Sequence, residues 1–277
     1  MFRPFRPVQE TAMLHSAPTV VVGVDGSKAA TNAVRWAVDE AVSRDIPLRL
    51  VHVIEPSGLS PTGAREDRMA TARSVLHDAQ RAVEATGERV KIETEILWGK
   101  PLAKLMKESR SAAMLCVGSI GLNRANRGVG SVSASLAASA LCPVAVIRRP
   151  TGRRATAKVG RVIVHGDDGA VLRHAFEEAR LRRAPLRAIA VSRAAGRDDV
   201  DARRSAQAQL RRRLARWTRL YPDVQVESAV VRGSVDRYLA ANVEPDQLFV
   251  ADASACYDLC GAHHAGSSVL ATRSSNL

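Results

Sequence analysis

A long internal repeat is the feature that most constrains how this chain folds. Residues 173–191, RHAFEEARLRRAPLRAIAV, align without gaps to residues 35–53, RWAVDEAVSRDIPLRLVHV. Each copy has an acidic pair within a helical pattern of apolar residues, followed by Pro-Leu-Arg at the start of an apolar run. A duplicated unit of this kind predicts two tandem domains in the 277 residues.

The first copy alternates between short apolar runs and longer segments with helical periodicity. The apolar runs typical of strands occupy residues 19–24, 48–54, 114–117 and 144–147, and residues 90–96 alternate as a strand with one face more exposed than the other does. Strands that alternate with helices along a chain favour a parallel sheet with right-handed crossovers. The predicted fold class is therefore α/β, with a parallel five-stranded sheet in the first domain.

The second copy is shorter than the first. Gly233 corresponds to Gly99, and residues 248–250 correspond to the fourth strand. On this alignment the chain ends at Leu277, before any counterpart of residues 142–149. We therefore expect a truncated second domain that lacks its fifth strand and part of the preceding helix, with a strand edge that a partner or the tail must cover. The predicted organisation is an extension at 1–18, a domain at 19–150, a linker at 151–158 and a degenerate domain at 159–277.

Composition excludes several classes of protein. No apolar run approaches the roughly 18 residues that a membrane-spanning helix needs, and residues 1–15 lack the apolar core of a secretion signal. Four cysteines are too few for a disulfide-stabilised secreted scaffold. Cys116 lies in an apolar run and is predicted to pack in the core. The net charge of +13 is spread over both halves and indicates a basic background. We predict a cytoplasmic protein that does not contact membranes.

A glycine-rich loop between the fourth strand and the next helix is the most distinctive local motif. Residues 118–133 read GSIGLNRANRGVGSVS. Small residues let the backbone approach a ligand closely, and free N–H groups at a helix start favour an anion. Arg124 and Arg127 are suited to pairing with phosphate, and Ser131 and Ser133 supply hydroxyl donors. From the spacing alone, a nucleotide site and a flexible loop with a helix cap are equally compatible with this motif.

Three segments resemble the universal stress protein family, in particular its tandem-domain type from mycobacteria and related actinobacteria. They are VVVGVDGS at 20–27, RLVHVIEP at 49–56 and GSVSASLAASALCPVAVIRR at 130–149. The resemblance implies Rossmann-like domains of the adenine nucleotide α-hydrolase type that bind an adenine nucleotide at the carboxyl ends of the strands. It implies ATP as the cofactor, with Mg²⁺ as a further candidate. The residues that it assigns to the cofactor site are Gly23, Val24, Asp25, Val53, Gly118, Gly121, Arg124, Arg127, Gly130, Ser131, Val132 and Ser133.

The loop departs from the family pattern at its phosphate end. Eight residues separate Gly121 from Gly130, whereas the family pattern has nine, and Gly128-Val129 replaces bulky aliphatic residues. One extended residue spans about 3.5 Å, so the deletion displaces donors by a distance that matters for phosphate binding. The adenine end of the site is therefore predicted more firmly than the phosphate end.

The second copy is predicted to lack a nucleotide site. Asp252 and Ala255 stand where the first copy has Gly118 and Gly121, and a carboxylate at such a position repels phosphate. The tail also contains cysteines and histidines, at Cys256, Cys260, His263 and His264. Their spacing is not the usual one for zinc, so no metal site is predicted.

One helix of the second copy is rich in arginine, with Arg203, Arg204, Arg211, Arg212, Arg213, Arg216 and Arg219. The nearby aromatic residues, Trp217 and Tyr221, fit the apolar face of that helix. Nucleic-acid binders usually combine a basic patch with a known module or with stacking aromatics. The arginines are therefore interpreted as a solvated face, and nucleic acid is not expected as a partner.

The sequence thus favours an ATP-binding regulatory protein of the stress response, with nucleotide in the first domain only. The resemblance further implies a homodimer formed through sheet edges, an unidentified regulatory protein partner and, at most, slow ATP hydrolysis. No convergent set of catalytic groups is apparent near the loop, so no catalytic residue is predicted. The alternatives are a slow ATPase and an interaction protein that no longer binds nucleotide.

Overall fold

The computed structural model describes residues 18–56, 62–119, 131–148, 159–192, 199–242, 244, 246–254 and 267–273. The strands are β1 (Val20–Gly23), β2 (Leu48–Ile54), β3 (Ile92–Trp98), β4 (Met114–Gly118), β5 (Val144–Ile147), β6 (Arg161–His165), β7 (Leu186–Ser192), β8 (Val226–Arg232), β9 (Gln247–Asp252) and β10 (Ser268–Thr272). The helices are α1 (Lys28–Arg44), α2 (Thr62–Glu84), α3 (Pro101–Glu108), α4 (Ser131–Ser139), α5 (Gly169–Arg182), α6 (Asp199–Leu220) and α7 (Val235–Ala241).

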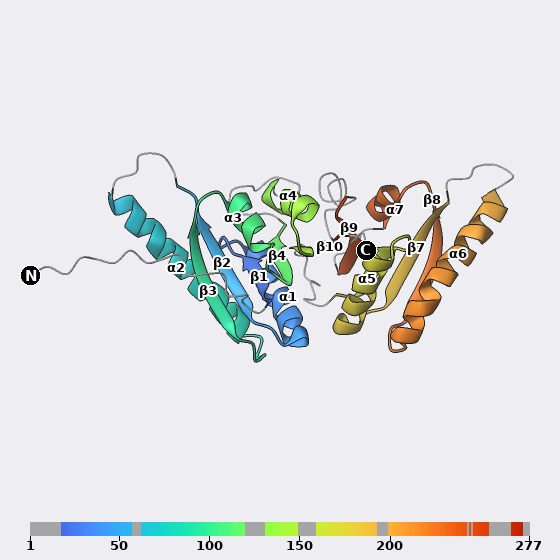
Figure 1. Ribbon diagram of the computed structural model, residues 1–277, viewed down its shortest axis with the longest axis horizontal. Helices are drawn as coiled ribbons and strands as arrows, with labels where there is room; N and C mark the ends of the chain where they lie inside the picture. The colour runs from blue at the N-terminus through green and yellow to red at the C-terminus, as the bar shows by residue number, and fades with distance from the viewer. Residues whose placement is uncertain are drawn as a thin grey trace, which may run out of the picture.

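The described strands form one sheet in the order β3-β2-β1-β4-β5-β10-β9-β6-β7-β8, which runs the length of the molecule (Figure 1). Within each half the described pairings are all parallel, as the sequence predicts. The two halves meet where β5 and β10 pair antiparallel. The prediction of an α/β fold with parallel five-stranded sheets is confirmed, and the antiparallel junction makes the whole sheet mixed.

The second half has a fifth strand, so the prediction that this strand is missing was wrong. Strand β10 pairs in parallel with β9, with Leu270 opposite Val250. The shortening falls between β9 and β10, and an alignment at constant offset cannot be carried across such a deletion. The strand edge that was expected to need a cover is paired with β5. Residues 255–266, where a helix like α4 was expected to be incomplete, lie outside the described part of the chain.

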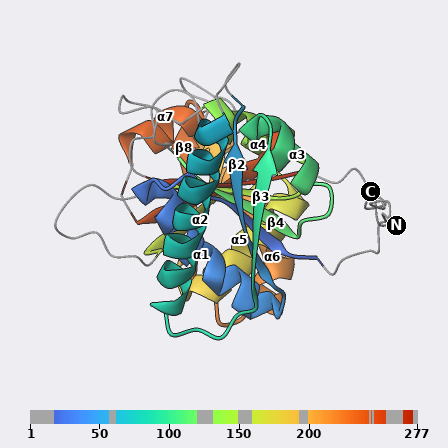
Figure 2. The same ribbon diagram turned by 90° about the vertical axis from the view of Figure 1, so that its left-hand side faces the viewer.

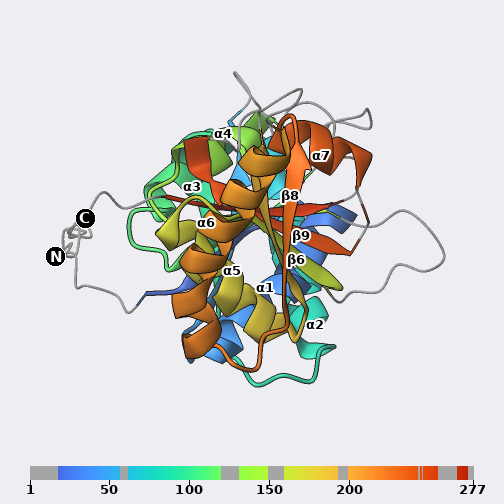
Figure 3. The ribbon, with the colours of Figure 1, turned by 90° about the vertical axis from the view of Figure 1, so that its right-hand side faces the viewer.

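Helices cover both faces of the sheet. One core contains apolar side chains of α1, α2, α5 and α6, and the other contains side chains of α3, α4 and α7. Figure 2 shows α2 and α3 on opposite sides of β3, and Figure 3 shows α6 beside β8 at the far end. Strands β1, β4 and β5 are almost entirely apolar because both of their faces are covered. In β1, Val20 and Val22 enter one core and Val21 enters the other.

Two expectations about single residues are confirmed in these cores. Cys116 is fully buried, and burial raises the pKa of its thiol well above the ordinary value. Trp217 and Tyr221 pack on the apolar side of α6. Their ring centroids lie 6.1 and 5.6 Å from that of Phe176. These aromatic rings therefore belong to the core.

A buried ion cluster joins α1 to α5 where the halves meet. The Arg182 guanidinium donates to Glu40 Oε1 at 2.6 Å and lies 3.4 Å from Glu178 Oε2. It also donates to Asp39 Oδ2 at 2.5 Å and lies 4.1 Å from the ring centroid of Trp36. Glu40 is 0% and Glu178 is 1% exposed. The acidic pairs that mark the sequence repeat therefore bring Glu40 and Glu178 together at one arginine.

Candidate functional site

The candidate site lies where the strand order of the first half reverses. Strands β2 and β4 flank β1, and Gly23 at the end of β1 is in register with Val117 in β4. The residues that follow, Val24-Asp25 and Gly118-Ser119, therefore leave the sheet side by side. In open α/β sheets, ligands bind beyond the carboxyl ends of the strands at such a reversal point.

The backbone after β1 is fixed by its neighbours. The Val24 amide donates to the Val51 carbonyl at 2.9 Å, and His52 Nδ1 lies 2.8 Å from the Val24 carbonyl oxygen. Asp25 Oδ1 accepts from the Ser27 amide at 2.9 Å. Gly26 has φ 85°, a left-handed conformation that favours glycine. The turn thus holds partly exposed Asp25 at the end of β1.

His52 is a site neighbour that the sequence reasoning missed. The signal was present, because a histidine interrupts the otherwise apolar end of β2, LVHVI. The ring hydrogen-bonds a backbone carbonyl in the site wall, and we assign it a positioning role. Val53, predicted to contact the adenine, is partly buried and packs against the core under α3 and α4.

Gly118 brings β4 into close contact with the start of α1. A Cβ atom at this position would lie 2.6 Å from the Ala29 carbonyl carbon and 2.7 Å from the Ala30 nitrogen. Real Cβ atoms essentially never come so close to backbone atoms. The space beside Gly118 is therefore occupied by α1, and the absence of a side chain serves packing within the chain.

Ser133 ties the first turn of α4 to the end of β4. Ser133 is 5% exposed, and its hydroxyl group donates a hydrogen bond to the Gly118 carbonyl oxygen at 2.8 Å. Ser131 begins α4, and Val132 packs on the core. This arrangement places the amino end of α4 beside the carboxyl end of β4. The first backbone N–H groups of a helix have no hydrogen-bond partner within the helix.

Four of the predicted site residues, Gly121, Arg124, Arg127 and Gly130, lie outside the described residues. The Cys256–His264 segment also lies outside them. Among the residues that the structure does describe, no group of three His, Cys, Asp or Glu side chains is placed to hold a metal ion. No helix in this part of the chain is long and apolar enough to cross a membrane.

The matching position in the second half is internally paired. Asp167, the counterpart of Asp25, forms an ion pair with Arg213 of α6 and lies 3.0 Å from His165 Nε2. Arg213 also donates to the Gly166 carbonyl oxygen at 3.3 Å.

Comparison with known proteins places the chain in a family. The sequence profile of the universal stress protein family matches residues 17–148. Universal stress protein Rv3134c of Mycobacterium tuberculosis is 60% identical over 263 residues, which cover 94% of this chain and 98% of that protein. Rv2028c of the same organism is 45% identical over 233 residues, or 82% of each chain.

A solved structure shows the same fold over both halves. A universal stress protein from Archaeoglobus fulgidus superposes with a TM-score of 0.68 at 14% identity, and the match covers 95% of this chain and 98% of that one. The match in fold and the sequence identity to Rv3134c both extend over nearly the whole chain. The chain therefore belongs to the universal stress protein family, in its tandem-domain form.

Proposed function

We propose that this protein is an ATP-binding regulator of the stress response that holds nucleotide in its first half only. The observation that carries the proposal is the setting of the first reversal point, where the turn after β1 lies beside the end of β4. Asp25 stands on a glycine-bounded turn beside the end of β4. Its counterpart Asp167 is paired with Arg213. The amino end of α4 beside Gly118 supplies the setting that an anionic phosphate requires.

The chemical character of the described residues suits an adenine nucleotide. Asp25 offers carboxylate oxygens that can accept hydrogen bonds from a ribose, and the walls beside it are apolar side chains of β2 and β4. Pockets for small ligands combine mostly apolar walls with a few placed polar groups. Among the described residues no group of three His, Cys, Asp or Glu side chains is placed to hold a metal ion, and we propose at most slow hydrolysis.

Titration calorimetry of the full chain with ATP tests the proposal. One ATP per chain is expected. Asp25→Ser keeps a short acceptor for the Ser27 amide but withdraws the carboxylate. A hydrogen bond to a charged group contributes about 1.5–3 kcal/mol, so this variant should bind ATP roughly tenfold to hundredfold more weakly.

Asp167→Ser is the matched control, because it makes the same change in the second half and should leave ATP affinity unaltered. Two ATP molecules per chain, or equal losses in both variants, would contradict a site confined to the first half. Absence of binding at millimolar ATP would favour the nucleotide-free interaction protein. Gly118→Asp is a poor test, because any Cβ at that position meets the backbone of α1.

We also propose that the protein acts in the cytoplasm as a homodimer with a regulatory protein partner. A dimer through sheet edges would have to use β3 or β8, since β5 and β10 pair within the chain. Light scattering of the purified chain should give about twice 29.8 kDa. A mass that stays at the monomer value across the micromolar range would remove the homodimer from the proposal.

A further inference from the structure

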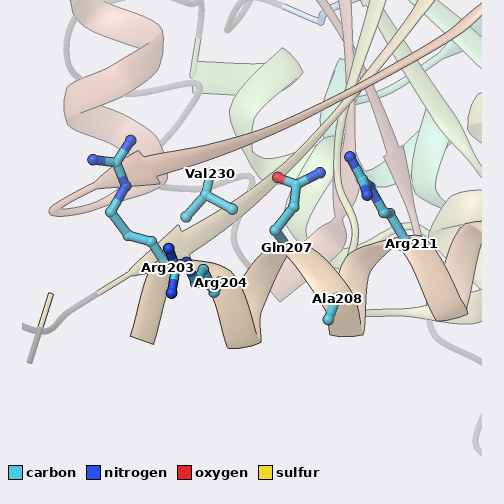
Figure 4. Close-up of a pocket in the computed structure, with 6 residues that line it drawn as sticks. All are labelled: Arg203, Arg204, Gln207, Ala208, Arg211 and Val230. Atoms are coloured by element: carbon cyan, nitrogen blue, oxygen red, sulfur yellow. The ribbon is translucent and has the colours of Figure 1, made fainter. Parts of the chain in front are cut away.

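A basic pocket lies at the far end of the molecule, away from the proposed nucleotide site. It has a volume of about 390 Å³ and is formed between α6 and the edge strand β8 (Figure 4). Its described lining is Arg203, Arg204, Gln207, Ala208, Arg211 and Val230. The helical residues recur at intervals of three and four, so they share one face of α6. The pocket thus presents three guanidinium groups around a small apolar floor.

Two acidic side chains that the structure describes near the pocket are directed elsewhere or bind weakly. Glu227 of β8 pairs with Arg187 at 2.9 Å, and Arg187 also contacts Tyr238 of α7, on the opposite face of the sheet. Asp201 lies 3.8 Å from Arg204, but both side chains are at least 80% exposed, and such a pair is worth little. No carboxylate is among the lining residues described for the pocket.

Gln207 connects the pocket wall on α6 to the sheet. Gln207 Nε2 donates to Ser228 Oγ at 2.7 Å, which connects α6 to β8 beneath the arginines. Val230, two residues further along the strand, faces the same side and packs against the core. The arginines therefore project from a helix that is fixed to the sheet at their midpoint.

The internal repeat shows that the fold itself does not require this charge. Helix α2 occupies the same place in the first half, beside β2 and β3, as α6 does beside β7 and β8. Helix α2 carries four arginines and four acidic residues. Helix α6 carries seven arginines and two aspartates. Of these two helices only α6 carries an excess of positive charge, and three of its arginines line the pocket.

From this geometry we infer that the α6–β8 pocket is a second anion site, which binds a small molecule carrying several phosphate groups. Guanidinium groups match phosphate oxygens with paired hydrogen bonds. The volume lies within the range of about 300–1,000 Å³ that is usual for small-ligand sites. A nucleic acid is disfavoured because the aromatic rings of α6, Trp217 and Tyr221, pack against Phe176 and cannot stack on bases.

Calorimetric titration of the full chain with inorganic tripolyphosphate tests this inference. The double variant Arg203→Gln/Arg211→Gln should weaken binding at least tenfold at fixed ionic strength. The matched control, Arg212→Gln/Arg219→Gln, removes the same charge from exposed positions of α6 outside the pocket and should change the affinity less than threefold. All four arginines are exposed, so both variants should keep the parent's thermal midpoint.

Several outcomes would overturn the inference. Equal weakening in both variants would indicate a diffuse field instead of a site. Unchanged binding in both would place the anion elsewhere, for example at the glycine-rich loop, and no binding at all would exclude the site. A single-stranded oligonucleotide that binds more tightly than tripolyphosphate, and displaces it, would assign the surface to nucleic acid. None of these readouts depends on whether ATP binds in the first half.

Discussion

Replacement of Arg182 by methionine probes how the two halves are held together. The Arg182 side chain is 5% exposed and is the shared cation of Asp39, Glu40 and Glu178. Methionine preserves much of the apolar stem and its packing on Trp36 but removes the charge. Glu40 and Glu178 would then lie buried together, and Arg44, at 3.0 Å from Glu40, would remain as a neighbouring cation.

The expected destabilisation is large. Removal of one partner from a buried ion pair costs about 3–5 kcal/mol, because the remaining charge is left without compensation. For a chain of this size, each kcal/mol shifts the thermal midpoint by about 2–4 °C, so a fall of roughly 10 °C is expected. Arg180→Met is the matched control on the same helix, since that side chain is 61% exposed. It should cost less than about 1 kcal/mol.

Urea denaturation followed by circular dichroism measures both variants. Glu178→Gln in the Arg182→Met background should restore part of the loss, because it removes the ionisable carboxyl group that lies buried beside Glu40. If Arg182→Met costs no more than Arg180→Met, or if Glu178→Gln adds a further loss, then the cluster does not stabilise the junction in the way described. Such a result would refute the reasoning.

The same cluster predicts a pH dependence of stability. The pKa of Glu178 is raised to about 8, chiefly by burial and then by Glu40, while Arg182 lowers it in part. Because this value lies above the ordinary 4.5, the folded chain holds a proton that the unfolded chain releases between those pH values. The free energy of unfolding should therefore fall as the pH rises from 4.5 towards 8, by at most about 1.4 kcal/mol per pH unit. Glu178→Gln should flatten this slope, and an unchanged slope would contradict the assignment.

Three further predictions concern the site and the sheet. Gly118→Ala should destabilise the chain by about 1–3 kcal/mol in thermal denaturation. Gly169→Ala is the control and should not destabilise it, because a Cβ atom there meets nothing within 4 Å. Equal effects of the two substitutions would argue against the tight contact of Gly118 with α1. Ser133→Ala leaves the Gly118 carbonyl without its donor and should cost about 1–2 kcal/mol in the same assay; a neutral result would mean that the hydroxyl does not anchor α4. Deletion of residues 268–277 removes β10 and exposes the edges of β5 and β9, so light scattering should show self-association; a stable monomer would contradict the role given to β10.

Much of the fold follows from local sequence. Strands β1, β4 and β5 of the first half are continuous apolar runs, and strands of a parallel sheet that are covered on both faces favour such runs. The missed strand, β10, has the sequence SVLAT, which is as suitable for a buried strand as VAVI in β5. It was overlooked because the repeat was extended at a fixed offset across a shortened segment. For this strand the apolar pattern predicts the structure better than the alignment of the two copies does.

The candidate site was harder to predict, because its contacts depend on how the elements pack. Gly118 was assigned to ligand approach, but the nearest neighbour of that glycine is the first turn of α1, which no local pattern reveals. The acidic pair at Asp39-Glu40 was noticed only as a marker of the repeat. Its partner, Arg182, comes from the other copy, and the two meet because β5 pairs with β10.

The antiparallel pairing of β5 with β10 also determines what the chain exposes to its neighbours. A sheet that is continuous through this joint has its two open edges at opposite ends, on β3 and β8. Association through one edge would leave the other available, so repeated pairing would build a fibre instead of a closed assembly. Charged side chains, including Glu93 on β3 and Glu227 on β8, are the usual protection of such edges. We expect the charged side chains on β3 and β8 to disfavour open-ended polymerisation of this molecule.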